Sequence, residues 1–188
     1  MRRLFIITSN TGKLREFQSE LSHLEIEVAN IDEGCEEIQA DTLEEVVVHC
    51  LGELKEKGVE NVIIDDSGLF IDSLRGFPGV YSSYVFKTLG CKGVLRLIEG
   101  MKDRNAHFSC CIGCILTNGE EIVVTENVNG RIGSKETGSQ GFGFDPIFIP
   151  DGDSRTFAEM SIEEKNLISH RGRAIRAFAS AFRKKTEM

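Results

Sequence analysis

Short apolar runs alternate with amphipathic segments along the first half of the chain. Residues 4–8 and 25–29 are predicted to be strands, because each is an apolar run bounded by polar residues. Between them, Leu14, Phe17 and Leu21 recur at the spacing of one helix face. This order of strand, polar loop, helix and strand indicates an α/β protein.

A second helix is predicted after an acidic stretch at residues 32–41. Thr42 and Glu45 form a capping-box pattern, which is a signature of a helix N-terminus. The apolar residues of this helix repeat at helical spacing and are Leu43, Val46, Val47, Cys50, Leu51 and Leu54. The acidic stretch is therefore expected to be a loop before the helix, and Glu37 lies within it.

The rest of the chain is arranged around residues 61–69, NVIIDDSGL. Its apolar residues predict a buried strand, and Asp65, Asp66 and Ser67 follow at the expected carboxyl end, where open α/β sheets bind ligands. Two adjacent acids at a buried position repel each other, so we expect a positive group nearby, with a divalent metal as the simplest candidate. The alternative is an ordinary turn, because aspartate, serine and glycine all favour turns.

The second half of the chain predicts a long antiparallel hairpin. Residues 106–116 and 122–128 are extended, and Asn118-Gly119 between them is typical of a two-residue hairpin turn. The loop RGFPGVYSS at 75–83 precedes the hairpin and leads into a helical segment that ends near Gly100. The expected fold is thus α/β with a mixed sheet, in which the hairpin extends into a second lobe and a cleft lies between the lobes.

The first polar loop carries candidate groups for an anionic ligand. It runs through Ser9, Asn10, Thr11 and Gly12, and Lys13 follows in the first helical turn. Backbone N–H groups at a helix start bind anions, and the lysine adds a flexible cation. The spacing of a Walker loop is absent.

The last third of the chain adds cations and aromatic rings. Lys165, His170, Arg171 and Arg173 lie in the first turns of two predicted helices, where positive charge opposes the helix dipole. This arrangement is unfavourable unless an anion binds, and the alternative is that two or three of these side chains point into solvent. The segment 141–146, GFGFDP, places two phenylalanines among glycines, and such rings either stack on a nucleobase or fill the core.

Composition narrows the class of protein. A chain of 188 residues suits a single domain, 1–188, which buries about 70% of its unfolded surface. The formal net charge of -8 argues against a nucleic-acid backbone as the main partner. No apolar run approaches the ~18 residues of a membrane span, and MRRLFIITSN lacks a small-residue cleavage site, so we expect a cytoplasmic protein.

Six cysteines raise the question of disulfides or zinc. Cys111 and Cys114 fall in a predicted strand, where residues three apart point to opposite faces and cannot share one tetrahedral metal. Because the sequence shows no signal peptide, we expect reduced and mostly buried thiols.

Seven segments in chain order resemble the inosine triphosphate pyrophosphatase family of non-standard purine nucleotide hydrolases. They are TSNTGK, the segment Glu37-Ile38-Gln39, DDSGLFIDSLRGFPGVYSS, GFGFDPIFIP, TFAEM, EEKN and SHRGRA. The resemblance extends from Thr8 to Ala174. It implies an elongated α/β fold, a mixed sheet flanked by helices with two lobes and a central substrate cleft, and a homodimer.

The resemblance also implies an activity and a set of site residues. The activity is hydrolysis of inosine, deoxyinosine and xanthosine triphosphates between the alpha and beta phosphorus atoms, giving a monophosphate and pyrophosphate and cleaning the nucleotide pool. Magnesium would be bound by Glu37 and Asp66, and Asp66 would also accept the proton. The substrate contacts would be Thr8, Ser9, Asn10, Thr11, Gly12, Lys13, Ser67, Phe142, Gly143, Phe144, Asp145, Lys165, His170 and Arg171.

Two other classes of protein fit these residues less well than this activity does. A non-catalytic purine nucleotide sensor would use the same loops, but it would have little need of Glu37 and Asp66 beside the phosphates. A phosphoaspartyl phosphatase would need D-x-D-x-T after its first strand, where this chain has TSNTGK.

Overall fold

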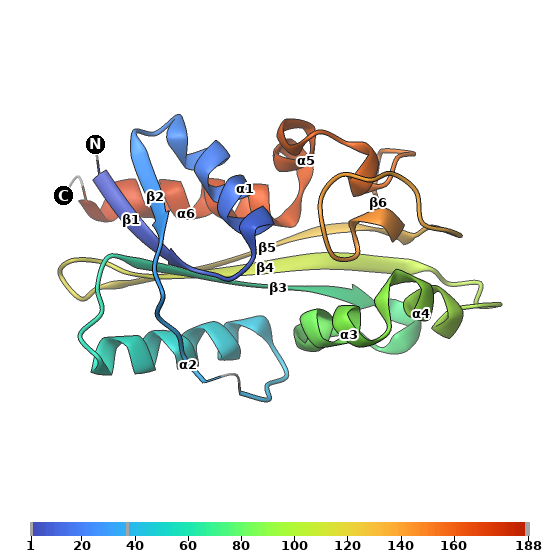
Figure 1. Cartoon of the computed structure of the whole chain (residues 1–188), viewed down its shortest axis with the longest axis horizontal. Helices are drawn as coiled ribbons and strands as arrows, with labels where there is room; N and C mark the ends of the chain where they lie inside the picture. Colours follow the sequence, from blue (N-terminus) through green and yellow to red (C-terminus); the bar gives the residue numbers. More distant parts are fainter. Residues whose placement is uncertain (1, 37, 187–188) are drawn as a thin grey trace.

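A six-stranded mixed sheet forms the centre of the computed structural model, which describes residues 2–36 and 38–186 (Figure 1). The strands are β1 (Arg2–Ile7), β2 (Ile26–Asn30), β3 (Val62–Ile71), β4 (Asn105–Ile115), β5 (Glu121–Ile132) and β6 (Phe148–Pro150). Their order is β2-β1-β3-β4-β5-β6. Strand β1 is parallel to both its neighbours, whereas β3 to β6 pair antiparallel. The predicted mixed α/β sheet is confirmed, and its strand boundaries at 4–8 and 25–29 were close to the observed ones.

Helices cover both faces of this sheet. They are α1 (Thr11–Ser22), α2 (Leu43–Glu56), α3 (Ser82–Thr88), α4 (Gly90–Leu97), α5 (Ile162–Ile168) and α6 (His170–Thr186). Helices α1 and α6 lie on one face and α2 lies on the other, while α3 and α4 lie farther along the sheet on the side of α2 (Figure 1). Among the helices of the described residues, none is both long enough and apolar enough to span a membrane.

The core follows the alternation of side chains along β4. Cys110 and Cys114 pack with α1 and α6, whereas Cys111 and Ile115 pack with α2 on the opposite face. A third apolar cluster fills the far end of the sheet and includes Phe108. The prediction that Cys111 and Cys114 point to opposite faces is confirmed.

The predicted local signals for helix starts and for the hairpin are present, with one change. Thr42 begins α2 with a capping box that includes Glu45. The hairpin turn contains Asn118-Gly119, but its loop has three residues, 117–119, because the N–H of Leu116 donates to Glu120 O at 2.8 Å. Gly119 has the positive φ of 77° that such a loop requires.

The central acids lie inside β3, so the prediction that they follow the end of this strand was wrong, as was the turn alternative. Asp65 pairs with Ile112 and Asp66 with Cys111 in the antiparallel ladder with β4. The pairing of β1 with β3 stops at Ile64, so these acids extend past the carboxyl end of β1. Backbone pairing with β4 continues the strand through these polar residues. A prediction based on apolar residues alone could not show this continuation.

The cysteines require a second correction. Cys35 and Cys50 form a disulfide with a Cα–Cα distance of 5.2 Å, which connects the acidic loop to α2. The other four cysteines are free and buried, as expected. Burial raises the pKa of the Cys114 thiol to about 12. The prediction of six reduced thiols was therefore wrong for Cys35 and Cys50. The conformation of the acidic loop brings these two residues together, and their spacing along the chain does not show it.

Candidate active site

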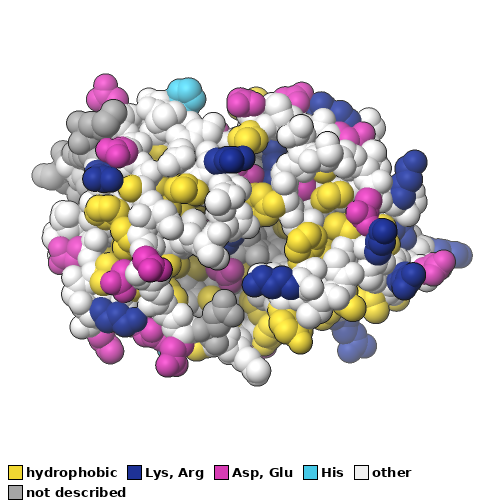
Figure 2. Space-filling model, in the orientation of Figure 1, with side chains coloured by type: hydrophobic (Ala, Val, Ile, Leu, Met, Phe, Trp, Pro, Cys, Tyr) yellow, Lys and Arg dark blue, Asp and Glu magenta, His cyan; other side chains and the backbone are white. Residues whose placement is uncertain are grey.

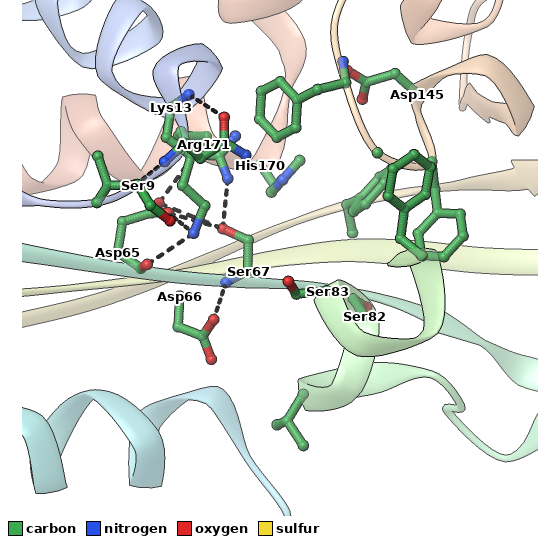
Figure 3. A pocket seen from close by; sticks show the side chains of 18 of the residues that line it. Ser9, Lys13, Asp65, Asp66, Ser67, Ser82, Ser83, Asp145, His170 and Arg171 are labelled. Carbon is green, nitrogen blue, oxygen red and sulfur yellow. Dashed lines mark hydrogen bonds and ion pairs between the residues drawn. The ribbon is translucent and has the colours of Figure 1, made fainter. Parts of the chain in front are cut away.

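A pocket with a volume of about 520 Å³ lies at the middle of the sheet (Figure 3). The face seen in Figure 2 is hollowed near its middle, with hydrophobic and charged side chains around the hollow. The predicted site residues that line the pocket are Thr8, Ser9, Asn10, Lys13, Asp66, Ser67, Phe142, Gly143, Phe144, Asp145, Lys165, His170 and Arg171. Folding thus brings together segments from both ends of the chain.

Three predicted residues differ from this group. Glu37 lies outside the described residues. Thr11 and Gly12 do not line the pocket. Gly12 shapes it indirectly, because a Cβ at this position would clash with the ring of Phe142. The amide N–H groups of Gly12 and Lys13 donate to the side chain of Asn10. These two donors at the helix start are therefore already paired, although they were expected to bind an anion.

Asp65 is enclosed by cations of the protein itself. Its carboxylate accepts from Lys13 Nζ at 2.5 Å, from Arg171 Nε at 3.0 Å and from Cys110 Sγ at 3.0 Å. Burial acts most strongly and opposes ionisation, but Arg171 and Lys13 outweigh it and lower the pKa of Asp65. The positive charge that was predicted near this acid is therefore supplied by Lys13 and Arg171.

Asp66 has the opposite surroundings. It points away from Lys13 and Arg171 (Figure 3) and is half-buried. The structure shows one hydrogen bond to its carboxylate among the described residues, from the N–H of Ser67 at 2.9 Å. Burial is the largest influence and raises the pKa of Asp66. A carboxylate with a raised pKa and few partners suits proton transfer.

Lys165 and Arg171 form a buried ionic network with carboxylates of the protein. Lys165 Nζ lies 2.8 Å from Glu16 and 2.7 Å from Asp145, and Arg171 Nη1 lies 2.7 Å from Glu16. The expectation that these cations need an external anion was therefore wrong, because the protein supplies the negative charge. Sequence reasoning missed Glu16, since most glutamates face solvent and nothing in the helical repeat distinguishes it.

The other two residues of the cationic segment behave differently. Arg173 is exposed and donates to the backbone oxygen of Asn127 at 3.1 Å, away from the pocket lining. His170 is buried and stacks on Phe108 with a centroid distance of 4.6 Å. Burial first, and then Arg171, lower the pKa of His170. At neutral pH this side chain is a neutral imidazole rather than the predicted cation.

The aromatic rings divide into packed and accessible ones. Phe144 is buried and meets the edge of Phe86 at a centroid distance of 5.3 Å. Phe142 is half-buried, with Lys165 4.7 Å from its ring centroid. Phe86 is 40% exposed and lines the pocket, so it offers an apolar surface that sequence reasoning missed.

Helix α3 forms a wall of the pocket that the sequence did not reveal. The lining residues missed on and near this wall are Val80, Ser82, Ser83, Phe86 and Lys87, with Phe108 elsewhere. Ser82 Oγ accepts from the N–H of Leu69 at 2.8 Å and donates to Gly79 O at 2.7 Å, which attaches the helix to β3. Gly68 permits this approach, because a Cβ there would clash with the Gly79 carbonyl. In the sequence, the two serines that end the loop RGFPGVYSS were the available signal for this wall of the pocket.

The fit of the site to a magnesium ion depends on Asp66. Among the described residues, no three His, Cys, Asp or Glu side chains gather in a way that could hold a metal. Magnesium in nucleotide sites needs less, because it binds one or two carboxylates together with substrate phosphates and water. The sparsely bonded carboxylate of Asp66 meets this requirement.

Comparisons with known proteins agree with the resemblance seen in the motifs. The model of the Ham1 family matches residues 4–181. A dITP/XTP pyrophosphatase of Pyrococcus horikoshii is 50% identical over 176 residues, covering 94% of each chain. One of Thermococcus kodakarensis is 51% identical over 178 residues, covering 95% of this chain and 96% of the relative.

Solved structures agree as well. The Ham1 protein of Staphylococcus aureus is 30% identical with a TM-score of 0.84, and the alignment covers 98% of this chain and all of that one. A HAM1 protein from Coxiella burnetii is 31% identical with a TM-score of 0.82 over 98% of this chain. The family model, the relatives and the shared fold lead to one conclusion: the chain belongs to the Ham1 family.

Proposed function

We propose that this protein hydrolyses non-standard purine nucleoside triphosphates to a nucleoside monophosphate and pyrophosphate, and so removes them from the nucleotide pool. The substrates are inosine, deoxyinosine and xanthosine triphosphates. One observation carries the chemistry: Asp66, a carboxylate with a raised pKa and few partners, borders a pocket with a cationic wall. Relatives that are 50% and 51% identical are named dITP/XTP pyrophosphatase, which supports this substrate class.

Asp66 is the proton acceptor in this proposal. A water molecule attacks the alpha phosphorus atom, its proton passes to the Asp66 carboxylate, and the bond from that phosphorus to the bridging oxygen breaks. The bonding electrons leave with pyrophosphate. Asp66 can accept the proton because no cation of the described residues pairs with its carboxylate, unlike that of Asp65.

The remaining groups bind and orient the triphosphate. Lys13 is only partly buried, so its ammonium can contact a phosphate while it stays paired with Asp65. Ser67 Oγ accepts from Arg171 Nη2 at 2.8 Å, which orients this hydroxyl at the pocket. These groups hold the phosphates in position without changing their own protonation.

We also propose a magnesium ion held by Asp66 and Glu37, in a homodimeric and cytoplasmic enzyme. When bound, magnesium neutralises phosphate charge and lowers the pKa of a coordinated water. The available carboxylate of Asp66 supports this metal, and the family resemblance supports the dimer.

The test is to incubate the protein with inosine triphosphate and magnesium and to resolve pyrophosphate from orthophosphate. We expect pyrophosphate and inosine monophosphate in equal amounts. Release of orthophosphate alone would contradict the proposed bond cleavage. Tight binding without any product would favour the alternative, a non-catalytic nucleotide sensor.

Adenosine triphosphate in the same assay tests the proposed substrate class. Hypoxanthine and xanthine have a carbonyl at the purine 6-position, whereas adenine has an amino group that would leave a donor of the pocket unpaired. A site built to hydrogen-bond one group rejects an analogue without it by up to roughly 10⁴-fold, so we expect a preference for inosine triphosphate of at least about 10²-fold. Comparable specificity constants for both nucleotides would contradict the pool-cleaning role.

A further inference from the structure

Most of the cations that line the pocket are paired with carboxylates of the protein. The exception lies on α3. The lysine and arginine side chains that line the pocket are Lys13, Lys87, Lys165 and Arg171. All of these except Lys87 are ion-paired with Asp65, Glu16 or Asp145. Without Lys87, three cations would thus face these three carboxylates and Asp66, and the pocket would carry a net negative charge.

Lys165 and Arg171 are not free to leave their partners. The side chains of Lys165 and Arg171 are only 3% and 2% exposed, and so are held within the protein. Breaking a buried ion pair leaves an uncompensated charge in a poorly solvated place, which is strongly unfavourable. These side chains can donate hydrogen bonds to a ligand, but they do not add net positive charge for a polyanion.

Lys87 differs from these cations in its surroundings. It is exposed, lines the pocket, and forms no ion pair with a carboxylate in the part of the chain that the structure describes. Ser83, Phe86 and Lys87 all line the pocket, and their spacing of three and four residues places them on one helix face. The attachment of Ser82 to β3 keeps this face towards the pocket.

We propose that Lys87 is a substrate-binding residue that contacts the phosphate chain of the nucleotide from the α3 wall, opposite Lys13. This inference rests on the proposed function, because it needs a polyanionic substrate. Lysine suits the contact, since its ammonium is a compact point charge on a long flexible stem. Its attraction to the phosphates is not offset by a carboxylate of the described residues.

A merely structural explanation makes a different prediction. Lys87 lies in the last turn of α3, where a positive charge interacts favourably with the helix dipole. In that case its removal would lower the melting temperature and leave substrate binding unchanged.

The experiment compares the wild type with Lys87→Gln, Lys87→Arg and a matched control, Lys92→Gln. Lys92 is an exposed lysine on the neighbouring α4 that does not line the pocket. With inosine triphosphate and magnesium, we expect Lys87→Gln to raise KM roughly tenfold with kcat little changed, as for the loss of one charged contact of about 1.4 kcal/mol. Lys87→Arg should retain most of the affinity, and the KM of Lys87→Gln should depend less on salt.

The outcomes separate this inference from the proposed function. A KM of Lys87→Gln within about twofold of the wild type, or an equal rise in Lys92→Gln, would overturn the role of Lys87. A wild type that releases no pyrophosphate would overturn the proposed function instead. Calorimetric titration of inosine triphosphate into the wild type and Lys87→Gln would then still decide whether Lys87 binds the nucleotide.

Discussion

Asp65 and Asp66 are neighbours in β3, but their side chains lie on opposite faces of the sheet and have opposite environments. On the α1 and α6 face, Asp65 is fully enclosed by Lys13, Arg171 and Cys110, and its pKa is lowered. On the α2 face, Asp66 accepts one hydrogen bond in the described structure, and its pKa is raised. The difference shows that the surroundings, rather than the residue type, set the pKa of each carboxylate.

The largest expected effect concerns the α2 face. Asp66→Asn removes the proposed proton acceptor, so we expect turnover of inosine triphosphate to fall by roughly 10²- to 10⁴-fold, with the far-ultraviolet circular dichroism spectrum unchanged. The control is Asp151→Asn, which removes one charge at an exposed aspartate outside the pocket lining. A folded Asp66→Asn protein with near-normal turnover would refute the assignment.

The matching change on the other face should affect stability first. Asp65→Asn leaves Lys13 and Arg171 without their shared carboxylate, and breaking a buried pair in this way costs about 3–5 kcal/mol. We expect urea denaturation to show a loss of this size, compared with Asp151→Asn. If Asp65→Asn instead kept its stability and lost turnover, the two aspartates would have exchanged roles.

The disulfide on the α2 face should give an intermediate effect. Cys35 and Cys50 are 15 residues apart, and closing a loop of that length stabilises a protein by up to about 3 kcal/mol. We expect Cys35→Ser to melt at a lower temperature than the wild type in non-reducing buffer, and we expect dithiothreitol to lower the melting temperature of the wild type. Reduction should have no further effect on Cys35→Ser, and an equal shift in both proteins would show that another thiol is responsible.

The smallest expected effect is a pH-dependent gain in stability. Because the folded state raises the pKa of Asp66, its ionisation at neutral pH opposes folding, whereas that of Asp65 favours folding. Asp66→Asn should therefore melt slightly higher than the wild type at about pH 7, and the gain should vanish near pH 3, where Asp66 is protonated in both states. The loss in Asp65→Asn should shrink as the pH falls through the lowered pKa of Asp65. A lower melting temperature of Asp66→Asn at neutral pH would show that the ionised carboxylate makes stabilising contacts.

The sequence by itself determined the local features of this protein. The start of α2 at Thr42, the turn at Gly119 and the opposite faces of Cys111 and Cys114 all follow from backbone preferences over a few residues. Because such preferences act between near neighbours, they can be read from spacing alone. The motifs also identified in advance most of the residues that line the pocket.

Only the tertiary structure decided which partners those residues have. Glu16 meets Lys165 and Arg171 across separations of 149 and 155 residues, and β4 extends β3 through Asp65 and Asp66. These contacts depend on the packing of the whole chain, so no local pattern distinguishes a glutamate that holds a buried arginine from one that faces solvent. The same packing leaves the Asp66 carboxylate with few partners while it encloses that of Asp65.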